Sequence, residues 1–130
     1  MVDTAYNPQD TDAYFNRAQT RFATGDYEGA VADYSETLKI DDQDAGTFYH
    51  RGKAYFALRN FIGAIDDFTQ AIQLNPQFVE AYRDRGNAYA WLGDLIDAKA
   101  DFLKVLEIQP THPQADYIRA KLQEWKDVLR

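Results

Sequence analysis

The two histidines are the side chains best suited to proton transfer, but their sequence surroundings give little support to catalysis. His50 lies inside a helical pattern and His112 follows Pro110 in an expected turn, and neither has an evident nucleophile beside it. The chain contains no cysteine, which excludes disulfides and thiolate metal sites. It also lacks a glycine-rich phosphate loop, zinc-ligand spacing and a calcium-binding loop. We therefore expect a protein that is not an enzyme and that has no cofactor and no bound metal ion.

Arginines and aspartates form a second set of charged groups, and they recur in pairs at one fixed spacing. Three times an arginine is followed sixteen residues later by an aspartate: Arg17 and Asp33, Arg51 and Asp67, Arg85 and Asp101. A partly buried guanidinium needs a carboxylate partner, since leaving such a charge unpaired costs on the order of 3 to 5 kcal/mol. We expect three ion pairs with a structural role, which fix the register of facing helices.

The arginines recur because the chain is built from units of 34 residues, which cover residues 11–44, 45–78 and 79–112. In each unit the fourth position is aromatic, the eighth is glycine or alanine, and the twentieth is alanine. Apolar residues recur at steps of three and four residues, which is the period of a helix. Each unit is therefore predicted to be a helix pair that packs on its neighbours in a stack.

Breaks in the helical pattern separate the two helices of each unit and separate one unit from the next. The breaks inside the units fall at Gly25-Asp26, Arg59-Asn60 and Gly93-Asp94. Glycine adopts the left-handed conformation that reverses the chain at low cost. Arg59 departs from this pattern, so we expect Asn60 to adopt the left-handed conformation in its place. The proline pairs Asn75-Pro76 and Gln109-Pro110 end the second helices.

The two ends of the chain lie outside these units. Residues 1–10 are either a leader without fixed structure or the remnant of an upstream unit, because Asn7-Pro8-Gln9 repeats the pattern of Asn75-Pro76-Gln77. Residues 113–130 are predicted to form a capping helix that covers the third unit. Its apolar face contains Ala115, Ile118, Leu122, Trp125 and Leu129.

The three units resemble the tetratricopeptide repeat family from Thr11 to His112. The first unit fits least well, with Ala18 at the glycine position and Asp42 at the proline position, as suits a terminal unit. The resemblance implies an all-α fold, a right-handed superhelix (α-solenoid) of three antiparallel helix pairs plus the capping helix. It also implies a protein-interaction module whose partner lies in a concave groove lined by the first helices.

The resemblance places twelve residues in this groove, where we expect a protein or peptide partner to bind. We expect Phe15, Tyr49 and Trp91 to be open to the partner, because their positions are variable and open in the family. Phe22 and Phe56 either face the groove or pack between successive first helices. The expected groove residues are Phe15, Asn16, Gln19, Phe22, Tyr49, His50, Lys53, Phe56, Arg83, Asp84, Asn87 and Trp91.

The polar residues of the groove limit what it can bind. Lys53 or Arg83 is expected to hold a single peptide carboxylate. Chaperone-binding relatives instead use a carboxylate clamp of lysine, asparagine and arginine at five places. Here those places hold Phe15, Gln19, His50, Glu80 and Asp84. The clamp is absent, and we expect no recognition of an acidic chaperone tail.

Charge and hydropathy restrict the class of partner and the location. The formal net charge of −7 argues against binding to nucleic acid or to anionic membranes. The chain has no apolar run of about 18 residues and no basic leader before a hydrophobic segment, so we expect a cytoplasmic protein without membrane insertion. The predicted function is a non-catalytic module that binds a peptide or helix of a partner protein. The alternative is a self-assembling scaffold that forms dimers or arrays through its terminal repeats.

Overall fold

The computed structural model describes residues 10–129, and this part of the chain contains seven helices and no strand. Residues 1–9, on which the choice between a leader and an upstream unit depends, lie outside the described residues. The helices are α1 (Thr11–Ala23), α2 (Tyr27–Ile40), α3 (Ala45–Ala57), α4 (Phe61–Leu74), α5 (Val79–Trp91), α6 (Leu95–Ile108) and α7 (Ala115–Trp125).

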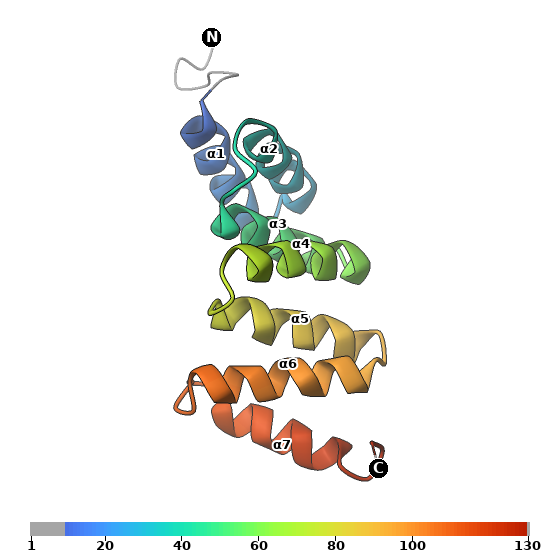
Figure 1. The fold of residues 1–130 in the computed structure, drawn as a ribbon. Helices are drawn as coiled ribbons and strands as arrows, with labels where there is room; N and C mark the ends of the chain where they lie inside the picture. The colour runs from blue at the N-terminus through green and yellow to red at the C-terminus, as the bar shows by residue number, and fades with distance from the viewer. Residues whose placement is uncertain (1–9, 130) are drawn as a thin grey trace.

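The helices form three pairs, α1 with α2, α3 with α4 and α5 with α6, which follow one another along a single stack (Figure 1). The second helix of each pair also packs on the first helix of the next pair, and α7 packs on α6. The predicted all-α solenoid of helix pairs is therefore confirmed. None of the helices in the described residues is long and apolar enough to cross a lipid bilayer.

Each turn inside a unit combines a left-handed residue with a side chain that caps the next helix. The left-handed residues are Gly25, Arg59 and Gly93, with φ of 87°, 62° and 79°. The expectation that Asn60 would take this conformation is wrong. Asn60 has a φ of −89° and caps α4, because its side-chain oxygen accepts a hydrogen bond of 2.9 Å from the backbone N–H of Gly63. Arg59 must then reverse the chain, at a cost of about 1–2 kcal/mol for a residue other than glycine.

The core repeats with the units, because each second helix buries one large aromatic ring. Phe68 on α4 and Phe102 on α6 are almost fully buried. Gly52 and Gly86 on the facing first helices let these rings approach the backbone. A Cβ atom would lie 2.7 Å from the Phe68 ring at Gly52 and 2.6 Å from the Phe102 ring at Gly86. The small residue at the eighth position is therefore required by ring packing in the second and third units.

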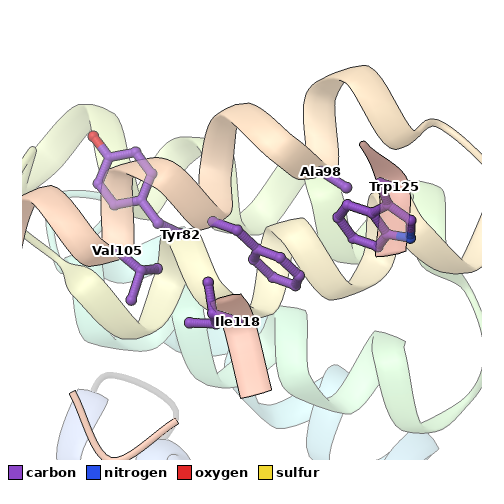
Figure 2. Packing of buried hydrophobic residues seen from close by; sticks show 6 residues of the cluster. Tyr82, Ala98, Val105, Ile118 and Trp125 are labelled. Carbon is purple, nitrogen blue, oxygen red and sulfur yellow. The ribbon is translucent and has the colours of Figure 1, made fainter. Parts of the chain in front are cut away.

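The predicted capping helix is present as α7, and its apolar face closes the end of the third unit. Figure 2 shows Ile118 and Trp125 of α7 beside buried side chains of that unit, among them Val105. The Trp125 ring stacks on Phe102 with 5.5 Å between the ring centroids. The helix runs from Ala115 to Trp125, within the range of 113–130 that the sequence assigned to it.

Candidate functional site: a groove across the first helices

The three expected ion pairs are present, and each joins the two helices of one unit. The shortest distance between guanidinium and carboxylate is 2.7 Å in all three. The aspartate side chains are buried, and this burial raises the pKa of Asp67 and of Asp101, while the hydrogen bonds from their arginines act in the opposite direction. The pairs are Arg17–Asp33, Arg51–Asp67 and Arg85–Asp101.

Two of the arginines also reach back to the preceding unit. Arg51 donates a hydrogen bond of 3.1 Å to the hydroxyl of Ser35 on α2, and Arg85 donates one of 3.1 Å to Thr69 on α4. Sequence reasoning missed these hydroxyl partners. The signal was available, because a hydroxyl residue occupies the twenty-fifth position of the first two units.

Six of the twelve expected groove residues line one pocket of about 290 Å³. They come from the first helices of all three units, and Ala57 and the buried ring of Phe68 complete the lining. The pocket therefore crosses the stack and brings together residues that are far apart in sequence. The six are Phe22 of α1, Lys53 and Phe56 of α3, and Arg83, Asp84 and Asn87 of α5.

The carboxylates around Arg83 already neutralise its charge. Arg83 lies 2.5 Å from a carboxylate oxygen of Glu80 and 2.9 Å from one of Asp84. The Tyr49 hydroxyl donates a hydrogen bond of 2.6 Å to the other oxygen of Asp84. Since these groups satisfy one another, Arg83 is held in place as part of the pocket wall.

Tyr49 itself is a core residue, so the expectation that it is open to a partner is wrong. Its side chain is only 7% exposed. The ring lies against Phe78, with 4.8 Å between the centroids, and against Phe68. Burial and the nearby Asp84 carboxylate both raise the pKa of Tyr49. The hydroxyl therefore stays protonated and keeps its hydrogen bond to Asp84.

Lys53 differs from Arg83, because no carboxylate within residues 10–129 forms an ion pair with it. Its ammonium group lies 5.5 Å from the ring centroid of Phe22 and 5.5 Å from that of Tyr49. Both contacts are within the range of cation–π attraction. Lys53 thus brings to the pocket wall a positive charge that forms no ion pair with a described carboxylate.

Phe15 of α1 and His50 of α3, two other expected groove residues, pack together with Tyr34 of α2. The Phe15 ring lies 5.7 Å from the rings of Tyr34 and His50, and His50 stacks on Tyr34. Burial lowers the pKa of His50, and the charge of Lys53 lowers it further. Gln19 accepts a hydrogen bond from the Tyr34 hydroxyl. His50 is therefore a packing residue that favours its neutral form, and Asn16 remains exposed on α1.

Trp91 is the most exposed of the expected aromatic residues, at 59%. It lies at the end of α5, where its ring stacks on Phe61 with 5.8 Å between the centroids. It also lines a second pocket of about 300 Å³ between the third unit and α7. Tyr117 and Lys121 of α7 line this pocket too, and sequence reasoning had not assigned either of them to a binding site. Asn87 borders both pockets.

His112 has a structural position at the start of the cap. Its Nε2 atom lies 2.9 Å from a carboxylate oxygen of Glu80, and its Nδ1 atom accepts a hydrogen bond from the backbone N–H of Gln114. Within the described part of the chain no group of three or more histidine, aspartate or glutamate side chains is arranged to hold a metal ion.

Comparison with known proteins agrees with this architecture. A model described as TPR repeat matches residues 18–58, and models described as tetratricopeptide repeat match residues 45–78 and 79–112. A search by sequence finds no match among proteins of curated function.

Solved structures of similar shape include several repeat domains. The second TPR domain of human RPAP3, in complex with the HSP70 peptide SGPTIEEVD, is 32% identical, with 90% of this chain and 98% of that chain covered and a TM-score of 0.82. The first TPR of Spaghetti (RPAP3), bound to the HSP90 peptide SRMEEVD, is 28% identical over 93% and 96% of the two chains, with a TM-score of 0.84. The Arabidopsis OM64 TPR domain is 25% identical over 92% and 98%, also with a TM-score of 0.84. From the tandem matches over residues 18–112 and these structures, the chain belongs to the tetratricopeptide repeat family.

Proposed function

We propose that the protein is a non-catalytic interaction module that binds a short peptide segment of a partner protein in the pocket across α1, α3 and α5. The observation that carries the proposal is the position of Lys53. Its ammonium group lies beside the rings of Phe22 and Tyr49 at the pocket wall, without a carboxylate partner among the described residues. A partner that supplies a carboxylate there gains a charge-assisted hydrogen bond.

The rest of the lining defines the ligand further. Phe22 and Phe56 offer apolar surface for one hydrophobic side chain. The amide of Asn87 has both a donor and an acceptor for the backbone of a bound segment. Arg83 is already paired with Glu80 and Asp84, so it supports the pocket wall rather than binding a second carboxylate. The proposed ligand is a peptide with one carboxylate and a neighbouring apolar side chain.

Two of the similar structures contain chaperone peptides, and these peptides differ in charge from the ligand proposed for this chain. The peptides SRMEEVD and SGPTIEEVD, bound by the RPAP3 domains, contain several acidic residues near their ends. In this chain Glu80 and Asp84 stand at two of the five clamp places, and their two negative charges exceed the one positive charge of Arg83, so they repel additional carboxylates. We infer that the protein binds a singly acidic peptide more tightly than an acidic chaperone tail.

The net charge of the chain restricts the class of partner. A net charge of −7 disfavours nucleic acid and anionic membranes, so the proposed partner is a protein. A cytoplasmic location is part of the proposal.

The test is a selection of binding peptides followed by affinity measurements. A displayed library of random heptapeptides is selected on the full chain, and the dissociation constants of the enriched peptides are measured by fluorescence anisotropy. Lys53→Gln is compared with the control Lys39→Gln, because Lys39 is an exposed lysine of α2 that pairs with Glu36. We expect Lys53→Gln to weaken binding on the order of tenfold or more, and Lys39→Gln to leave it unchanged.

The same measurements would contradict the proposal in two ways. Enriched peptides that contain no acidic residue, or that bind the Lys53→Gln variant as tightly as the parent, would remove Lys53 from the site. Tight binding of the peptides SRMEEVD and SGPTIEEVD would show that the groove accepts several carboxylates despite Glu80 and Asp84.

A further inference from the structure

A second exposed apolar surface lies away from the groove pocket, at the turns inside the second and third units. We call this surface the turn ridge. The beginnings of α4 and α6, which follow these two turns, lie on the same edge of the stack, at the right of Figure 1. The ridge consists of Leu58, Ile62, Trp91, Leu92 and Ile96, of which Ile62 is 63% exposed and Ile96 72% exposed.

Ring contacts join the two turns into one surface. The Trp91 ring of the third unit stacks on Phe61 of the second unit, with an angle of 4° between the ring planes. The ridge ends at the first unit, where Thr24 and Glu28 occupy the positions of Leu58 and Ile62. Exposed apolar surface of this kind, restricted to two adjacent units, is typical of an interaction site.

Charged groups of both signs lie at the two turns of the ridge. In the second unit the Arg59 guanidinium lies 4.8 Å from the Trp91 ring centroid and has no carboxylate partner among the described residues. In the third unit the turn is followed by Asp94 and Asp97, which lie close together, because the Asp94 carboxylate accepts a hydrogen bond of 3.2 Å from the backbone N–H of Asp97. The equivalent positions of the second unit are neutral, and hold Asn60 and Gly63.

We propose that the turn ridge is the interface of a homodimer, and that its occupant is a second copy of this chain. A two-fold axis that passes between the two turns, perpendicular to the stack, places the second unit of one copy against the third unit of the other. Arg59 of each copy then faces Asp94 and Asp97 of the other, while the apolar residues meet at the centre. A two-fold axis along the stack would instead place each unit against the same unit of the other copy and bring like charges together, so the charges favour the axis perpendicular to the stack.

A dimer formed through the turn ridge would leave the pocket around Lys53 open to a peptide. None of the five ridge residues lines the pocket around Lys53. The ridge is small for a protein interface, so we expect a weak dimer with a dissociation constant in the micromolar range. The dimer would present two groove pockets, but its formation does not depend on whether the groove binds a peptide.

Sedimentation velocity of the full chain over a range of concentrations tests the proposal. Ile62→Glu with Ile96→Glu removes the apolar centre, and both glutamates fall in the first turn of a helix, where the dipole favours a negative charge. Val128→Glu is the matched control, because Val128 is an equally exposed apolar residue outside the ridge. We expect the double variant to be monomeric, and the control to dimerise as the parent does.

Charge reversal tests the orientation of the two copies. Arg59→Asp and Asp97→Arg should each weaken the dimer on the order of tenfold, and the two together should recover part of that loss, because opposite charges then face each other again at one of the two acidic positions. Circular dichroism of each variant shows whether the fold is retained. A parent chain that stays monomeric up to about 1 mM would overturn the proposal. A dimer that survives the double glutamate variant would overturn this interface. So would single charge reversals that leave the dimer unaffected, or a combination of the two reversals that dimerises no better than either alone.

Discussion

The Arg51 guanidinium donates two hydrogen bonds of 2.7 Å to the Asp67 carboxylate and so ties α3 to α4. Its remaining terminal nitrogen donates to the Ser35 hydroxyl of the preceding unit. One side chain therefore connects three helices, α2, α3 and α4. Because the Asp67 side chain is 4% exposed, the energetic importance of the pair depends on what replaces each partner.

Arg51→Leu should lower the free energy of unfolding by about 3 kcal/mol, because it leaves the buried Asp67 without its guanidinium. The double variant Arg51→Leu with Asp67→Leu should recover most of that loss, since two apolar side chains leave no buried charge unpaired. Urea denaturation of the parent, both single variants and the double variant gives the coupling free energy. A double variant that loses as much as the two single variants summed would show that the pair has no coupling.

Gly52→Ala should lower the free energy of unfolding by about 1–3 kcal/mol, because the new Cβ would meet the Phe68 ring at 2.7 Å. The control is Gly46→Ala at the start of the same helix, where the nearest atom is a side-chain oxygen of Asp44 at 3.3 Å. There the higher helix propensity of alanine should leave stability unchanged or raise it. Thermal melting followed by circular dichroism compares the two variants. Equal melting temperatures for both would show that the Phe68 ring shifts freely.

The fold could be predicted from the sequence, because the 34-residue period repeats the same packing requirements in every unit. Arg17, Arg51 and Arg85 found their expected partners for the same reason: a spacing of sixteen residues places both groups on facing helices. Features that recur in each unit are fixed by the backbone arrangement, and sequence reasoning can find them.

The groove could be predicted only in part, because it depends on side chains that differ between units. Tyr49 occupies a position that is open in the family, yet Phe78 from the end of the same unit covers its ring. Arg83 and Lys53 looked alike in sequence, but Glu80 and Asp84 pair with only one of them. The spacing of three residues between Glu80 and Arg83 could have indicated that pairing.

Arg59→Gly should leave the free energy of unfolding nearly unchanged. Glycine at a φ of 62° relieves roughly 1–2 kcal/mol of backbone strain. The variant loses the contacts of the guanidinium with Phe61 and Trp91, which at exposed positions contribute about 0.5–1 kcal/mol each. Chemical denaturation of the parent and the variant measures the net change in the free energy of unfolding. A loss above about 2 kcal/mol would mean that the two rings depend on Arg59 for their positions.

Acid should destabilise the protein through His50, whose pKa is lowered in the folded state by burial and by the charge of Lys53. The unfolded chain takes up a proton near the ordinary histidine pKa of 6.5, and the folded chain does so only at lower pH. The stability contributed by the neutral ring is therefore fully present above pH 6.5, and it is lost as the pH falls toward the folded-state pKa. Asp67 and Asp101 have raised pKa values and act in the opposite direction, so the comparison must isolate His50. The free energy of unfolding of the parent and of His50→Gln is measured by denaturation at pH 7.5 and at about pH 5.5, and it should fall more between these pH values for the parent. An equal fall for both proteins would mean that His50 is protonated as readily in the folded state as in the unfolded chain.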